Sequence, residues 1–218
     1  MNHVALRRAL LALVALFTAA ALVAYLVLGT ALRGTLLVLG AAAGCASAVV
    51  WIGAPLKERR VLLARVRVGA AAGIVATLAY DVTKFAVARL IRSPRNPFET
   101  VRLFGVLLAG RAAPAAVVDA AGATYHFTNG AAFGVAFSIL LGRRGATAGV
   151  LWGLGLELMQ LLLYPRWLHL DALGEFTVVS LAGHTTYGLV LGSLCRRGLH
   201  ARTQAAFSVD AGEASRRP

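Results

Sequence analysis

The sequence predicts an all-α fold, a polytopic membrane helix bundle with six transmembrane helices and both termini in the cytoplasm. Three observations lead to this prediction: 59% of the 218 residues are hydrophobic, only 14% are charged, and the apolar residues form long uncharged runs. A soluble domain usually has about 25% charged residues. Because runs of about 20 apolar residues match the hydrocarbon thickness of a bilayer, the composition indicates an integral membrane protein.

Six apolar runs are expected to be the membrane-spanning helices of one transmembrane domain, residues 1–197. Only helices and closed barrels satisfy the backbone inside hydrocarbon, and uninterrupted runs favour helices. The first run is longer than the apolar core of a signal peptide, so we expect a retained helix rather than a cleaved leader. The expected helices cover about 9–28, 34–54, 68–90, 124–141, 146–164 and 173–194.

Two segments outside these runs have other expected structures. In the long connection 91–123, Asn96 and Glu99 have the spacing of a capping box, which predicts a short amphipathic helix over about 97–110 with Asn96 as its N-cap. This helix is expected at the outer membrane interface, as a surface connector in preference to a lid over an outward-facing pocket. Residues 198–218 are polar and lack periodicity, which predicts a disordered cytoplasmic tail.

The net charge of +13 comes from basic clusters between the apolar runs. Most of these clusters fall on the side that also holds both termini, and the positive-inside rule places that side in the cytoplasm. Membrane lipids are the expected partners, together with a possible homo-oligomer. No nucleic-acid partner is expected, because no basic patch is interleaved with aromatic residues.

Glycine pairs four residues apart occur in the second to sixth expected helices. Such small-residue faces let helix backbones approach closely in lipid, so they predict a tight bundle with the first helix at its periphery. The pairs are Gly40/Gly44, Gly69/Gly73, Gly130/Gly134, Gly149/Gly153 and Gly188/Gly192.

Polar side chains inside four of the expected helices are costly in hydrocarbon, and the predicted orientation places them at or outside the midplane. A shared depth gives them potential partners in one outward-facing polar pocket. The candidates are Asp81, Lys84, His126, Asn129, Glu157, Gln160 and His184.

A structural explanation competes with the functional one at each position. Asp81 and Lys84 are three residues apart and can pair along one helix face. His126 can be an interfacial residue, and His184 a hydrogen-bonded packing residue. Glu157 is hardest to explain this way, because it lies at the centre of "GVLWGLGLELMQLLLYP" without a basic residue nearby.

The sequence indicates no cofactor and no metal, and it leaves the catalytic residues unknown. The histidines and carboxylates are suitable ligands for zinc or iron, but their spacing matches no HExxH, HxxxH or ExxH pattern. Cys45 and Cys195 have no CxxC spacing. No serine nucleophile elbow, phosphate-cradling loop or dinucleotide-binding pattern is present.

Several segments over residues 68–197 together resemble the YagU-like bacterial inner-membrane proteins, a family associated with acid resistance. They are "GAAAGIVATLAYDVTK", "RSPRNP", "HFTNGAAFGVAFSILL", "GVLWGLGLELMQLLLYP" and "GHTTYGLVLGSLCRR". The resemblance implies a multi-pass protein of the bacterial plasma membrane. Its polar positions map to Lys84, Arg92, Pro94, His126, Gln160, Pro165 and His184.

The resemblance also shows one departure, because the acid that usually closely precedes the Gly-His pair is displaced here to Glu175, about nine residues earlier. Glu175 is therefore a weaker candidate for the pocket, and Arg92 is a second weaker candidate.

Three functions remain open. The first is handling of a small solute or proton, or a response to envelope or acid stress, through the polar pocket; histidine is the side chain whose charge changes most readily near neutral pH. The second is a membrane-embedded enzyme that acts on a lipid or isoprenoid with carboxyl groups as general acids. The third is a structural subunit of a membrane assembly.

Overall fold

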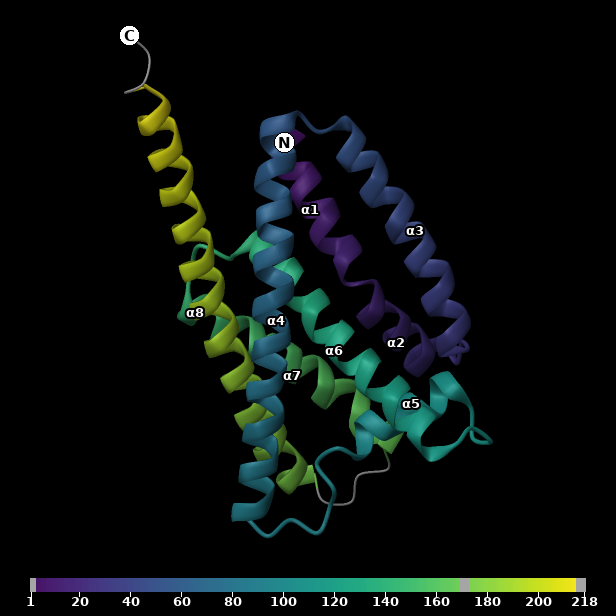
Figure 1. Cartoon of the computed structure of the whole chain (residues 1–218). Coiled ribbons are helices and arrows are strands. Elements are labelled where there is room, and N and C mark those ends of the chain that lie inside the picture. The colour runs from purple at the N-terminus through teal and green to yellow at the C-terminus, as the bar shows by residue number, and fades with distance from the viewer. Residues whose placement is uncertain (1–2, 169–172, 215–218) are drawn as a thin grey trace.

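The computed structural model describes residues 3–168 and 173–214, and all regular structure in them is helical, which confirms the predicted all-α class for this part of the chain. The described helices are α1 (His3–Ala15), α2 (Phe17–Leu28), α3 (Leu32–Gly53), α4 (Leu56–Leu90), α5 (Glu99–Ala109), α6 (Ala115–Leu140), α7 (Ala146–Leu168) and α8 (Leu173–Ala214) (Figure 1).

The membrane character is supported by four helices that are long and apolar enough to cross a bilayer, namely α3, α4, α7 and α8. The α1–α2 pair makes a fifth if its two bent parts form one span. Helix α6, which contains His126 and Asn129, is not among these candidate spans. Six spans and cytoplasmic termini therefore stay predictions, although α1 begins and α8 ends at the same end of the bundle (Figure 1).

The core of the bundle is formed by α4, α6, α7 and α8. Helix α4 packs against both α6 and α8, and α7 packs against α8. A Cβ atom on Gly73 would meet the backbone oxygen of Gly130, and one on Gly149 would meet that of Gly188. The small-residue faces on these four helices thus allow the close backbone contact that their spacing predicts.

The first predicted helix is broken and is not peripheral. Helices α1 and α2 meet at Leu16 with a bend of 53°. Beyond the bend, the Thr18 hydroxyl donates to Asn129 Oδ1 over 2.7 Å, and the Tyr125 hydroxyl donates to the Thr18 carbonyl over 3.0 Å. These tertiary hydrogen bonds hold the start of α2 against α6, while α1 packs more extensively against α6 and the rest of α2 packs against α3.

The peripheral helix is α3, which stands apart from the core in Figure 1. Leu37 and Val38 on it are 68% and 69% exposed, and a Cβ atom on Gly44 would have no neighbour within 4 Å. The Gly40/Gly44 pair is thus the one small-residue pair that does not mediate a close helix contact among the described helices. In a bilayer, most of this helix contacts lipid.

Several helices extend beyond their predicted ends. Helix α4 begins at Leu56, directly after Pro55, and α6 begins directly after Pro114. Helix α7 continues through Pro165 to Leu168. Helix α8 continues to Ala214, where the sequence predicted a disordered tail from residue 198. Arginine, alanine and glutamine favour helix, and they extend a span that is already stable.

Helix α5 lies within the predicted interfacial segment, but its N-terminus differs from the prediction. Phe98 is the N-cap, and no side chain caps the helix. Asn96 Oδ1 instead accepts the backbone N–H of Phe98 over 2.9 Å, which stabilises the turn before the helix. Gly105 of α5 and Gly122 of α6 let these two helices cross closely.

Candidate functional site

The first of two histidine–carboxylate pairs joins α4 to α6. His126 Nε2 lies 3.0 Å from Asp81 Oδ1 and 3.1 Å from Oδ2, with both side chains less than one-fifth exposed. This contact corrects the expected pairing within α4, because Lys84 does not pair with Asp81. Lys84 Nζ donates to the Pro97 carbonyl over 2.9 Å instead.

The second pair joins α7 to α8. His184 Nδ1 lies 2.7 Å from Glu157 Oε2, and the hydroxyl of Ser180 donates to Glu157 Oε1 over 2.7 Å. Glu157 is only 3% exposed and Ser180 only 1%. The carboxylate that the sequence left without a basic neighbour is therefore held by two groups from the adjacent helix.

Tyr80 lies between the two pairs. Its ring centroid is 4.9 Å from that of His184 and 6.1 Å from that of His126. The ammonium of Lys84 lies 5.0 Å from the same ring, at cation–π distance. One buried aromatic residue thus contacts three of the candidate polar side chains.

The two pairs meet at a central cavity of about 430 Å³. Five of the seven candidates line it, namely Lys84, His126, Asn129, Gln160 and His184. Asp81 and Glu157 are not among the lining residues, because each lies behind its histidine. The convergence that the sequence predicted thus occurs through the histidines rather than through the carboxylates.

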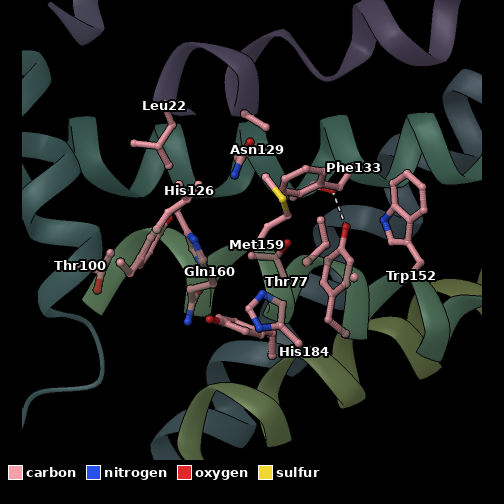
Figure 2. Close-up of a pocket in the computed structure, with 18 of the residues that line it drawn as sticks. Leu22, Thr77, Thr100, His126, Asn129, Phe133, Trp152, Met159, Gln160 and His184 are labelled. Atoms are coloured by element: carbon pink, nitrogen blue, oxygen red, sulfur yellow. Dashed lines mark hydrogen bonds between the residues drawn. The ribbon is translucent and has the colours of Figure 1, made fainter. Parts of the chain in front are cut away.

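The cavity has a polar part and an apolar part. In Figure 2 the side chains of His126, Gln160 and His184 gather in one region, while Phe133 and Trp152 lie further along. Helices α2, α5, α6, α7 and α8 all contribute apolar residues to the wall. A volume of this size lies in the range of about 300–1,000 Å³ that is typical of small-molecule sites.

A second cavity of about 320 Å³ adjoins the first, and Lys84, Thr100 and Phe176 line both. Its wall includes Glu175, whose Oε2 atom accepts a hydrogen bond from Ser93 Oγ over 3.1 Å. Arg92 lines neither cavity. Its backbone φ of 54° instead places it in the left-handed region, at the turn that ends α4.

The two halves of the site repeat one arrangement. Along the first helix of each pair, small residues recur every fourth position and end at the acid. They are Gly69, Gly73, Thr77 and Asp81 in α4, and Gly149, Gly153 and Glu157 in α7, with Gly145 at the same step directly before α7. Along the second helix of each pair, a histidine is followed by two glycines at the same four-residue step. They are His126, Gly130 and Gly134 in α6, and His184, Gly188 and Gly192 in α8.

The contacts follow the same register. Close backbone contact joins Gly73 to Gly130 in one half and Gly149 to Gly188 in the other. One helical turn after Thr77 in α4 and after Gly153 in α7, the acid of each half contacts its histidine. By this register Lys84 corresponds to Gln160, and both line the central cavity. The site is therefore built from two helix pairs of the same register, α4–α6 and α7–α8.

Sequence reasoning missed Tyr80 and Ser180. Both look like ordinary helix residues, and only the tertiary packing shows that they contact the candidate pairs. The repeat could have been found in the sequence, because the H-x₃-G-x₃-G spacing occurs in both α6 and α8.

Within residues 3–168 and 173–214, no three histidine, cysteine or acidic side chains gather as a metal-binding group. The pairs instead have the chemistry of proton transfer. When the carboxylate is ionised and the imidazole is neutral, His184 donates through Nδ1 and leaves Nε2 as an acceptor. The same logic leaves Nδ1 of His126 as the acceptor in the first half.

Comparison with known families matches residues 63–206 to DUF6789, a family of unknown function. The match covers more than half of the chain, so the chain belongs to this family. It includes α6, α7, most of α4 and most of α8, and therefore both histidine–carboxylate pairs. Neither a curated protein nor a solved structure matches the chain.

Proposed function

For this member of a family of unknown function, we propose a multi-pass membrane protein that binds a small amphipathic molecule in the central cavity and exchanges a proton with it. The observation that carries this proposal is the position of two histidines on one largely apolar cavity, one backed by the buried Glu157 and the other by the partly buried Asp81. The resemblance to YagU-like proteins supports a location in the bacterial plasma membrane, with the cavity in its outer half.

The proton exchange follows from the tautomers. When a bound molecule releases a proton, Nε2 of His184 takes it with its lone pair, and the bonding electrons stay on the molecule. The resulting imidazolium is stabilised by Glu157, 2.7 Å from the other ring nitrogen. Ser180 holds that carboxylate in place, so the charge forms next to a preorganised partner. A role in handling a solute or in acid stress would use this step.

The binding proposal is tested by filling the cavity. Gly155 lines it, and a Cβ atom there would meet nothing within 4 Å, so Gly155→Leu adds volume without a backbone clash. The matched control is Gly44→Leu on α3, where a Cβ atom also meets nothing within 4 Å and which does not line the cavity. Each protein is purified from membranes in mild detergent, and bound small molecules are identified by native mass spectrometry.

We expect a bound molecule in the wild type and in Gly44→Leu, and its loss in Gly155→Leu. Equal amounts in all three proteins would contradict binding in this cavity. Proton exchange is then measured by titration calorimetry with the recovered molecule in buffers of different ionisation enthalpy. The dependence on buffer should disappear in the His126→Gln/His184→Gln double variant and remain in His3→Gln.

A second candidate function is an enzyme that uses His184 as a general base on a lipid or isoprenoid. The Ser180–Glu157–His184 chain favours it, because a carboxylate that orients a histidine is a recurrent general-base arrangement. Product analysis separates the two functions: an enzyme returns a chemically altered molecule, and a binding protein returns it unchanged. A structural subunit would give neither result, and His184→Gln would then affect only the amount of folded protein.

A further inference from the structure

The two helix pairs of the site, α4–α6 and α7–α8, differ in charge at one corresponding position. Lys84 and Gln160 each lie three residues after the acid of their helix, and both line the central cavity. The repeat therefore presents a cation in one half and a neutral amide in the other. The cavity therefore has a cation on one side only, a charge asymmetry that the two histidine–carboxylate pairs alone would not create.

The Lys84 ammonium has unused hydrogen-bonding capacity. An ammonium has three donors, and in the described part of the chain one is used, by the Pro97 carbonyl at 2.9 Å. No carboxylate of the described residues lies within ion-pair distance of Nζ. Asp81 and Glu157 are each paired with a histidine, His126 and His184.

Lys84 also lies where the two cavities adjoin. It lines the central cavity and also the second cavity, whose wall is richer in polar residues. Arg95 adds a second cation to that wall, while Glu99 and Glu175 add two acids. Glu175 accepts a hydrogen bond from Ser93, and none of these acids pairs with Lys84 among the described contacts.

We infer that the cavity takes a single-chain amphiphile with an anionic head group, held by Lys84 at the junction of the two cavities. The chain lies along Phe133 and Trp152 in the central cavity, and the head group reaches the ammonium. A charged donor favours an anionic acceptor over a neutral one, because charge-assisted hydrogen bonds are about twice as strong. This inference rests on the proposed function and names the class of its ligand.

The test uses photoactivatable probes on the full chain in nanodiscs of zwitterionic lipid. A diazirine-bearing dodecanoic acid is compared with the diazirine-bearing alcohol and amine of the same chain length. Crosslinked residues are mapped by mass spectrometry. The variants are Lys84→Gln, which makes the two halves alike, Lys84→Arg, which keeps the cation, and the control Arg89→Gln on the same helix, outside both cavities.

We expect the acid to label the central cavity about tenfold more than the alcohol or the amine in the wild type. Lys84→Gln should lose this preference, and Lys84→Arg and Arg89→Gln should retain it. Unlabelled dodecanoate should compete, and inorganic phosphate alone should not, because it lacks the chain. Competition by phosphate would overturn the requirement for an amphiphile.

Failure of this inference and failure of the proposed function give different results. Equal labelling of the cavity by acid and alcohol would overturn the anionic head group and leave cavity binding intact. Preference for the amine would also overturn it. Cavity labelling by none of the probes in the wild type, in samples of native size and helicity, would count against both proposals. The comparison of probes needs no variant, so it holds even if Lys84→Gln folds poorly.

Discussion

The carboxylate of Glu157 and the imidazole of His184 are joined by a contact of 2.7 Å between Oε2 and Nδ1, inside a helix pair that is closed by glycines. This contact fixes which ring nitrogen remains free for the cavity. The acid that the sequence places without a basic neighbour in the middle of α7 is thus not isolated, because each oxygen of Glu157 has a hydrogen-bond partner on α8.

Glu157→Gln should destabilise the folded protein by about 1–3 kcal/mol. The amide keeps the shape of the side chain, but its NH₂ group cannot accept the bond that Oε1 or Oε2 now accepts. The free energy of unfolding is measured in lipid bicelles by steric trapping. Asp119→Asn is the control: its ion pair with Arg102 is 3.7 Å long and exposed on both sides, so we expect a change below about 1 kcal/mol.

Gly73→Ala and Gly149→Ala should each destabilise the bundle by about 1–3 kcal/mol, because the added methyl group meets a backbone oxygen of the opposite helix. The two positions correspond in the repeat, so the two losses should be similar. Gly44→Ala adds the same methyl group on α3, where nothing lies within 4 Å. A loss as large in Gly44→Ala would show that the effect does not come from helix contact.

Arg65→Gln should loosen the end of α6. The Nη1 atom of Arg65 donates to the carbonyls of Ser138 and Ile139 over 2.5 and 2.9 Å, where helix carbonyls lack internal partners. We expect a loss of about 1–3 kcal/mol and faster hydrogen exchange at the end of α6. Arg67→Gln, at an exposed position, should leave exchange there unchanged.

Thr18→Val should weaken the attachment of α2 to α6. The substitution removes the donor to Asn129 Oδ1 and keeps the shape of the side chain, at an expected cost of about 1 kcal/mol. Thr35→Val is the matched control, because the Thr35 hydroxyl bonds near its own position, to Thr30 and to the Ala31 carbonyl. Equal losses in both variants would contradict a tertiary role for Thr18.

The sequence was informative where lipid imposes strong rules. Apolar runs located the long helices, and small residues at a four-residue step located the close contacts of α4, α6, α7 and α8, since both follow from the physics of a bilayer. The gathering of Lys84, His126, Gln160 and His184 was also expected, because expensive polar groups at one depth need partners.

The partners themselves could not be predicted from spacing. Asp81 has a cation three residues away, yet it bonds His126 on another helix, because the close α4–α6 crossing brings that ring within 3.0 Å. The bend at Leu16 was equally hidden, and so were the contacts of Thr18 just beyond it with Asn129 and Tyr125 of α6, because both belong to the tertiary packing. Helix ends in polar segments, such as the end of α8, depend on propensity alone and are hard to place.

The contribution of α2 to the cavity wall has a consequence for how molecules enter it. Ala19, Leu22 and Val23 close one flank of the cavity, but the family match starts only at residue 63. That flank therefore lies outside the region that the family match covers. Without α2, acyl chains of the surrounding bilayer would border this flank of the cavity, and molecules dissolved in the membrane would enter it sideways.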